Sequence, residues 1–191
     1  IKLDTKALGN WMKQYHGPYQ LSCKLDGVSA LFYNEGSTPK LYTRGNGIEG
    51  QDISHLIPYL RLPLKTKCSL RGELIISKDV FQKKYSQDSA NARNLVSGWV
   101  NRKIASPDLW NDLSFVVYEM VYPETNPLHQ TTLLKKMNVT CVETFQTKGL
   151  DNTILSKLLV DMRNKYQYEI DGIIVREDKY VSPSATNPKN A

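Results

Sequence analysis

One lysine of this sequence has neighbours that suit a nucleophile. Lys24 lies in an apolar run and is followed by Asp26 and Gly27. In an extended chain alternate side chains share a face, so Lys24 and Asp26 are predicted to point the same way, and Gly27 leaves room for a close approach to the backbone. Only about one free lysine in a few thousand is neutral at pH 7. Desolvation and a cationic neighbour lower the pKa of a lysine, so the rest of the chain is expected to supply a pocket, a positive neighbour and a phosphate-bearing substrate.

Three further motifs place charged residues beside glycine. They are TRGNG at residues 43–47, LRGE at 70–73 and IDGIIV at 170–175. A glycine loop alone is weak evidence for phosphate binding. Taken singly, Arg44 is also an ordinary exposed loop residue, and Glu73 and Asp171 are ordinary surface carboxylates or strand-end caps.

Composition limits the kind of partner and compartment. The 191 residues carry 25 basic and 19 acidic side chains, a net charge of +6, which suits a polyanionic partner. Cys23, Cys68 and Cys141 have neither zinc-site spacing nor the density of a disulfide framework, so we expect a reducing intracellular compartment: cytoplasm, nucleoid or a viral replication site. No apolar run is long enough to predict a membrane span.

Periodicity predicts an α+β domain in which helices pack on antiparallel sheets. Short helices are expected over 55–60 and after Ser77, and a helix over 4–15 is assigned to packing. Two strand-like runs, 20–33 and 39–44, are expected to form a hairpin. The other predicted helices cover 91–103, 130–137 and 152–165, and the other strands cover 69–76, 114–122, 139–145 and 168–176.

The order and spacing of these motifs resemble the adenylation domain of NAD-dependent DNA ligases, a branch of the covalent nucleotidyltransferases. NARN at residues 91–94, with Ser97 and Gly98, is similar to a fifth motif of that family. The pattern TRGxGxxGxD at residues 43–52 resembles the NAD-dependent branch rather than the ATP-dependent one. The resemblance covers nearly the whole chain and implies one domain, 1–191, with an ATP-grasp-like nucleotidyltransferase fold and a central nucleotide cleft.

The resemblance assigns roles around the nucleotide. Lys24 would attack the adenylyl phosphorus and hold AMP through a phosphoramide bond, and Asp26 would orient the lysine or the attacking strand end. Arg44 would contact the ribose or phosphate and keep Lys24 deprotonated by charge repulsion. Glu73 would accept a hydrogen bond from a ribose hydroxyl. Tyr118 would stack on the adenine; without the resemblance, it is predicted to be a core aromatic residue.

Further assignments concern the other nucleotide contacts and the metal. Ile174 would lie against the second face of the adenine, and Leu25 would also contact the nucleotide. Asp171 would sit near Mg²⁺, with Glu73 as a second, water-mediated metal contact. The implied substrates are NAD as the AMP donor and nicked double-stranded DNA. The implied protein is a monomeric ligase of DNA replication and repair.

Three positions depart from the family pattern. Ser22 replaces a glutamate that would contact the adenine amino group. Arg176 stands where the family has a phosphate-binding lysine; it keeps the charge but is bulkier. Arg93 resembles the arginine that contacts nicked DNA. The second arginine of that helix is displaced by one position, with Asn101 at its expected place and Arg102 next to it.

The ends of the chain also differ from the family. Residues 187–191 resemble the approach to a final lysine motif and stop before it. The helical domain that recognises the nicotinamide half of NAD would precede this chain. An oligonucleotide-binding fold, a zinc finger and a helix-hairpin-helix module would follow it. These features predict an excised or trimmed domain with partial activity.

Two alternatives remain open at this point. One is an ATP-dependent polynucleotide ligase, acting on DNA or RNA. The other is a non-catalytic module that binds nucleic acid or senses nucleotides, which the departures at Ser22 and Arg176 favour. The joint retention of Lys24, Glu73 and Asp171 opposes that second alternative.

Overall fold

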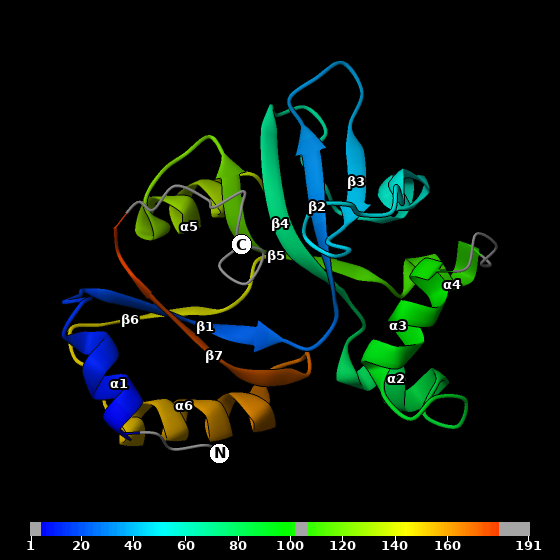
Figure 1. Ribbon diagram of the computed structural model, residues 1–191. Coiled ribbons are helices and arrows are strands. Elements are labelled where there is room, and N and C mark those ends of the chain that lie inside the picture. The colour runs from blue at the N-terminus through cyan, green and yellow to red at the C-terminus, as the bar shows by residue number, and fades with distance from the viewer. Residues whose placement is uncertain (1–4, 102–106, 180–191) are drawn as a thin grey trace.

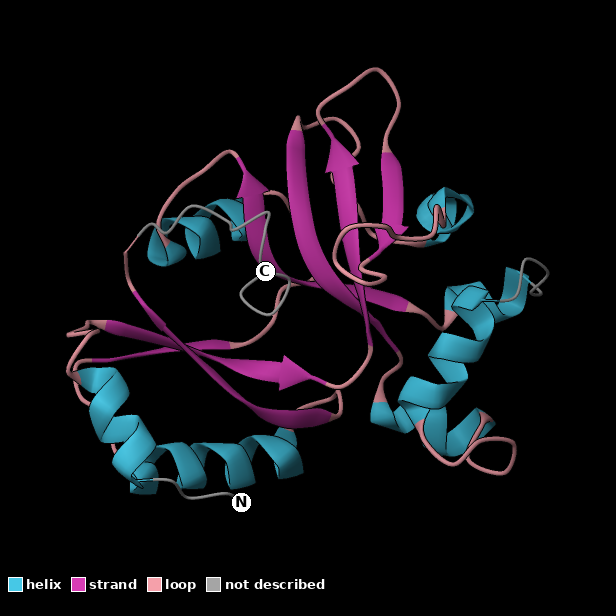
Figure 2. Ribbon diagram, in the orientation of Figure 1, coloured by secondary structure: helices cyan, strands magenta, loops and turns pink. Residues whose placement is uncertain are grey.

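Two antiparallel sheets form the framework of the computed structural model, which describes residues 5–101 and 107–179 (Figures 1 and 2). The three-stranded sheet has the order β6-β1-β7 and the four-stranded sheet has the order β3-β2-β4-β5. The strands are β1 (Tyr19–Leu25), β2 (Val28–Asn34), β3 (Lys40–Thr43), β4 (Cys68–Ile75), β5 (Ser114–Tyr122), β6 (Thr144–Thr147) and β7 (Ile170–Glu177). The predicted α+β class with antiparallel sheets is confirmed.

Helices cover the two sheets separately (Figure 1). Helices α1 and α6 pack on the three-stranded sheet, whereas α2, α3 and α4 lie beside one end of the four-stranded sheet, and α5 packs against β5. The helices are α1 (Thr5–Met12), α2 (Lys78–Lys84), α3 (Ala92–Asn101), α4 (Pro107–Asn111), α5 (Pro127–Lys136) and α6 (Asn152–Lys165), with a 3₁₀ helix at Ser54–Tyr59.

Side-chain caps fix where several helices begin. The Asp151 carboxylate accepts a hydrogen bond of 2.7 Å from the Ile154 amide, and α6 begins at the next residue. The Asn126 side chain accepts a 2.8 Å bond from the His129 amide at the start of α5. Such caps satisfy amides that the first helical turn leaves without partners. The expected boundaries of α6 are confirmed, whereas α5 begins three residues earlier than expected.

The strand run expected over 20–33 is wrong in one important respect. It divides at Asp26 and Gly27 into β1, which pairs with β6 and β7, and β2, which pairs with β3 and β4. Asp26 lies outside both strands, and its amide donates a 3.0 Å hydrogen bond to the Glu169 carbonyl. Lys24 and Asp26 therefore do not share a strand face as predicted; each pairs with a different partner.

Other boundaries differ because tertiary packing decides them. The strand expected over 139–145 is reduced to β6, with only an isolated bridge from Cys141 to Val117 before it. Helix α1 ends at Met12 rather than at residue 15, and the short α4 was not expected. The hairpin between β2 and β3 is confirmed. Arg102 and the tail over 182–191 lie outside the described residues.

Two large hydrophobic clusters hold the sheets and helices together. Phe32, Leu70 and Phe115 of the four-stranded sheet are buried together with Val96 and Trp99 of α3. A second cluster lies between the three-stranded sheet and α6 and includes Cys23, Met162 and Ile170. It also takes in Ile75 of β4 and Val116 of β5, so apolar contacts join the two sheets beside the cleft. Among the described helices, none combines the length and apolarity needed to cross a bilayer.

Gly27 is predicted to be essential for the connection between the sheets. A Cβ at this position would lie 2.4 Å from the Leu74 carbonyl oxygen and 2.8 Å from Glu73 Cγ. Gly27→Ala should therefore lower the free energy of unfolding by about 1–3 kcal/mol, as measured by urea denaturation. Gly98→Ala in α3 is the matched control: its Cβ would meet nothing within 4 Å. That variant should be as stable as the parent or up to about 1 kcal/mol more stable. Equal stabilities of the two variants would contradict the prediction.

Candidate active site

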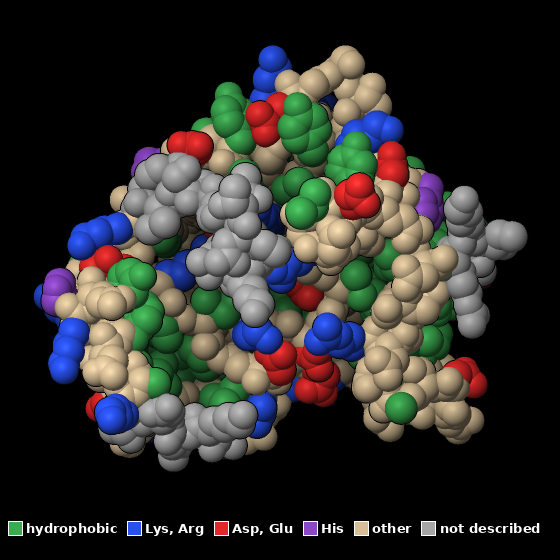
Figure 3. Space-filling view, viewed as in Figure 1, with side chains coloured by type: hydrophobic (Ala, Val, Ile, Leu, Met, Phe, Trp, Pro, Cys, Tyr) green, Lys and Arg blue, Asp and Glu red, His purple; other side chains and the backbone are tan. Residues whose placement is uncertain are grey.

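A cleft of about 1090 Å³ opens between the two sheets. Basic and acidic side chains gather at its mouth in the space-filling view (Figure 3). Asp26 does not line the cleft itself but contacts Arg93, which does. Nine of the residues singled out from the sequence line it: Lys24, Leu25, Arg44, Glu73, Arg93, Tyr118, Asp171, Ile174 and Arg176.

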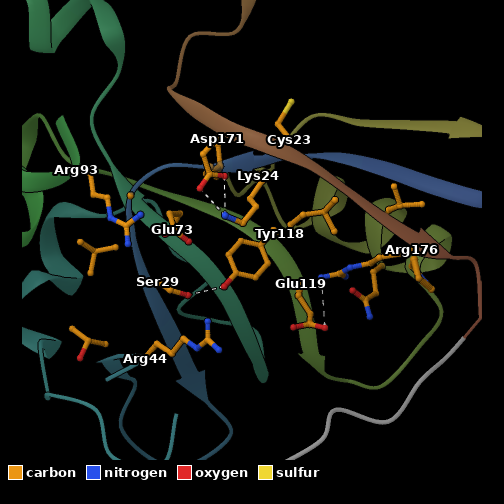
Figure 4. A pocket seen from close by; sticks show the side chains of 18 of the residues that line it. Cys23, Lys24, Ser29, Arg44, Glu73, Arg93, Tyr118, Glu119, Asp171 and Arg176 are labelled. Atoms are coloured by element: carbon orange, nitrogen blue, oxygen red, sulfur yellow. Dashed lines mark hydrogen bonds and ion pairs between the residues drawn. The ribbon is translucent and has the colours of Figure 1, made fainter. Parts of the chain in front are cut away.

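Lys24 and Asp171 form an ion pair inside the cleft. Lys24 is the penultimate residue of β1, and its Cα partner on β7 is Gly172, so Asp171 lies next to it. The Lys24 Nζ is 2.8 Å and 2.6 Å from the two carboxylate oxygens of Asp171 (Figure 4). The two side chains are 55% and 38% exposed.

The pocket expected around Lys24 is present, and Arg44 lines it too. The amine itself, however, is half exposed and contacts a carboxylate rather than a cation. Arg44, the expected cationic neighbour, lies beyond the Tyr118 ring as seen from Lys24 (Figure 4). An ion pair requires the ammonium form, so Lys24 must lose its proton before it can act as a nucleophile.

Glu73 is a partly buried carboxyl group surrounded by charges. Burial raises its pKa to about 7, although the nearby cations Arg93 and Lys24 act in the opposite direction. Arg93 of α3 donates a 2.9 Å hydrogen bond to the Asp26 carboxylate. Two ion pairs, Lys24–Asp171 and Arg93–Asp26, thus flank a carboxyl group that is about half protonated at neutral pH.

A β-bulge orients Tyr118 toward the cleft. Arg71 of β4 is paired with Glu119, but the next residue, Gly72, is paired with Val117, so Tyr118 is the extra residue of β5. Bulges of this kind redirect side chains and recur beside active sites. The Tyr118 hydroxyl is 2.7 Å from the Ser29 Oγ, and burial raises the pKa of this phenol. The hydroxyl group therefore stays neutral. The ring is held by β5, to which it belongs, and through Ser29 by β2.

The glycine loop after β3 holds Arg44 at the rim of the cleft. The Asn46 side chain accepts hydrogen bonds from the Ile48 and Glu49 amides, at 2.9 Å and 2.8 Å. Gly45 has a φ of +54°, and a Cβ there would lie 1.8 Å from the Glu49 carbonyl oxygen. Only glycine fits this turn. The Arg44 amide donates to the Ser29 carbonyl at 2.9 Å, which fixes the start of the loop against β2.

Several cleft residues were not predicted from the sequence, among them Ser29, Glu119, Trp11 and Tyr15. Ser29 and Glu119 line the cleft beside Tyr118, and Trp11 and Tyr15 line it from α1 and the turn after it. The helix expected to serve packing alone thus also contributes two stacked aromatic rings, with centroids 4.7 Å apart. Glu119 did carry a signal: it is the one charged residue in the apolar strand over 114–122.

The carboxylates of the cleft fit a Mg²⁺ ion shared with a substrate. No three His, Cys, Asp or Glu side chains within residues 5–101 and 107–179 group into a metal site. Asp171 and Glu73 nevertheless line the same cleft. Mg²⁺ is commonly held by one or two carboxylates together with substrate phosphates and water. The donor set is therefore suited to an ion that arrives with a nucleotide.

Glu73 should make stability depend on pH. Its pKa rises from 4.5 to about 7 on folding, so the folded state binds this proton more tightly. The contribution of this protonated carboxyl group to the free energy of unfolding is fully present below about pH 4.5 and is lost as the pH rises through about 7. Glutamine does not titrate, so Glu73→Gln does not lose stability in this way. Its free energy of unfolding minus that of the parent should therefore increase by about 1–3 kcal/mol between pH 5 and pH 8. Urea denaturation across this pH range is the measurement. If the free energies of unfolding of parent and variant change with pH in parallel, the raised pKa of Glu73 is refuted.

The solved structures that are similar to this one include DNA ligases. A Lig E DNA ligase superposes with a TM-score of 0.59 and 19% identity, covering 91% of this chain and 61% of that one. A putative ATP-dependent DNA ligase from Aquifex aeolicus has a TM-score of 0.59 and 16% identity, covering 94% and 45%. These likenesses confirm the nucleotidyltransferase fold.

Sequence relatives are more specific. The DNA ligase of Acanthamoeba polyphaga mimivirus is 40% identical over 98% of this chain, and a putative DNA ligase of Invertebrate iridescent virus 6 is 38% identical over 98%. The DNA ligase of Borrelia hermsii is 32% identical over 93%. The chain spans about a third of these relatives, 31%, 33% and 30% of their lengths. Residues 4–183 match the family described as the NAD-dependent DNA ligase adenylation domain. This chain belongs to that family of adenylation domains.

Proposed function

We propose that Lys24 accepts AMP from NAD and that the intact ligase transfers this AMP to the 5′-phosphate of nicked DNA. The observation that carries the proposal is the position of the Lys24 amine in a cleft lined by acidic, basic and aromatic side chains from both sheets. The family match supports NAD as the donor.

The nucleotide is proposed to bind between the walls of the cleft. Tyr118 of the four-stranded sheet and Ile174 of the three-stranded sheet supply an aromatic and an aliphatic surface for the two faces of the adenine, and Leu25 adds a further apolar contact. The hydrogen bond to Ser29 keeps the Tyr118 ring in place before binding. Glu73 is assigned to a ribose hydroxyl.

The phosphates are assigned to the charged part of the cleft. Arg44 and Arg176 line it and would stabilise charge on the phosphate oxygens. Mg²⁺, when bound with the nucleotide, would neutralise further phosphate charge, with Asp171 and Glu73 as its candidate protein contacts. These contacts position the adenylyl phosphorus for Lys24.

Lys24 must give up a proton before it attacks. The Asp171 carboxylate, at 2.6 Å from Nζ, is placed to accept that proton or to hold the amine until it is released. The neutral amine then forms a P–N bond to the adenylyl phosphorus as the P–O bond to nicotinamide mononucleotide breaks. Covalent attachment divides one difficult displacement into two easier steps.

Later steps are assigned to the intact enzyme on nicked DNA. The DNA 5′-phosphate takes AMP from Lys24, and the adjacent 3′-hydroxyl then displaces AMP to form the phosphodiester bond. Arg93, which is 57% exposed at the mouth of the cleft, is the candidate contact with a DNA phosphate. Parts of the ligase beyond this chain, which spans about a third of its relatives, are proposed to recognise the nicotinamide half and to surround the duplex.

Lysine adenylation is tested directly by mass spectrometry. After incubation with NAD and Mg²⁺, the full-length protein should gain one AMP, and Lys24→Ala should abolish the adduct because the attacking amine is gone. Lys83→Ala is the matched control, since Lys83 is an exposed lysine that also pairs with a carboxylate, Asp79, at 2.7 Å; it should be adenylated normally.

A parallel incubation with ATP separates the alternatives. An adduct from ATP but not from NAD would replace the NAD-dependent assignment with an ATP-dependent one. No adduct from either nucleotide, with duplex binding retained, would favour a non-catalytic binding module. An adduct that persists in Lys24→Ala would place the nucleophile elsewhere.

Arg93 should contribute to binding of nicked duplex mainly through charge. Arg93→Gln should weaken binding uniformly across sequences and reduce the slope of log K against log salt by about one. Titration of a nicked duplex at several salt concentrations is the measurement. Arg163→Gln, an exposed arginine on α6, is the control and should change the slope less. Equal slopes for the two variants would show that Arg93 does not contact a DNA phosphate.

A further inference from the structure

Glu119 lies between two arginines that come from different sheets. Arg71 of β4 is its cross-strand partner, and the Arg71 Nη1 donates a 3.0 Å hydrogen bond to the Glu119 Oε2. On the other side, the Arg176 Nη2 of β7 is 3.8 Å from the Glu119 Oε1. The carboxylate therefore connects the four-stranded sheet to the three-stranded sheet across the cleft (Figure 4).

The β-bulge places this pair in the cleft itself. Because Tyr118 is the extra residue of β5, Glu119 follows it along the same wall, and both line the cleft with Arg176. The Glu119 and Arg176 side chains are 20% and 27% exposed. A charge that is shielded to this degree is costly without a partner, so the pairing restricts both side chains.

We infer that Glu119 is a positioning residue that holds the Arg176 guanidinium at the cleft wall, oriented for the phosphates of the nucleotide. The inference deepens the proposed function and rests on it. At 3.8 Å the Glu119–Arg176 contact is an ion pair but not a hydrogen bond, so the donors of Arg176 remain available to a substrate.

Charge balance within the trio supports this role. Arg71 makes the short hydrogen bond to Glu119 and offsets its negative charge, so the positive charge of Arg176 is left for an anionic ligand. Arginine suits such a place because its planar guanidinium can face a carboxylate on one edge and phosphate oxygens on another, whereas lysine is a single point charge. The arginine at position 176 and the glutamate at 119 are thus explained together.

The test compares Glu119→Gln, Arg176→Met and the double variant. Two quantities are measured in the full-length protein: the dissociation constant for AMP by calorimetry, and the NAD dependence of Lys24 adenylation. Glu119→Gln should weaken AMP binding and raise the half-saturating NAD concentration by about 2- to 5-fold, the loss expected for one partly exposed ion pair. The maximal rate at saturating NAD should change less. The double variant should be no worse than Arg176→Met alone, because Glu119 acts through Arg176.

Controls separate positioning from stability. Asp79→Asn removes the carboxylate of an ion pair on α2 and should leave both quantities unchanged. If Glu119→Gln does not fold, Arg71→Met with Glu119→Met removes Glu119 together with its hydrogen-bonded partner, so that Arg71 is not left unpaired, and should show the same loss. Parent-like AMP and NAD values in Glu119→Gln, or effects that add fully to those of Arg176→Met, would overturn the inference. Absence of an adduct in the parent would instead refute the proposed function, while AMP binding would still test Glu119.

Discussion

The structure depends on a two-residue connection between its sheets. Asp26 and Gly27 carry the chain from β1 of one sheet to β2 of the other, and Gly27 packs directly on the backbone of β4. The connection packs so closely that there is no room for a side chain at Gly27. Because it spans only two residues, the end of β1, which carries Lys24, and the start of β2, which carries Ser29, line the same cleft. The position of the amine is thus a consequence of how the sheets are joined.

Electrostatics then divides the cleft into two parts. Near Lys24, alternating charges surround Glu73, whose pKa burial raises to about 7. Farther along, Tyr118 and Ile174 provide surfaces for a flat, uncharged ring. A nucleotide has the same division between base and phosphate. In the proposed function, the ion pair of Lys24 with Asp171 is the resting form, in which the amine is held in place before it reacts.

Local signals in the sequence predicted the elements that local interactions determine. Helix α6 was predicted to the residue because the apolar spacing that indicates it lies within the element itself. The split at Gly27 was missed, because strand propensity does not reveal which strands will pair. The Lys24–Asp171 contact joins residues 147 positions apart, and only the family resemblance brought them together beforehand. Glu119 was missed because its direction depends on a bulge that pairing with β4 creates.

The most direct test of the central claim, that Lys24 receives adenylate in this cleft, is a crystal structure of the protein with AMP bound. The account predicts an adenine between Tyr118 and Ile174, a phosphate facing the Lys24 Nζ, and an Asp171 carboxylate displaced from that amine. AMP bound outside the cleft, or bound inside it with Lys24 still paired to Asp171 and remote from the phosphate, would contradict the account.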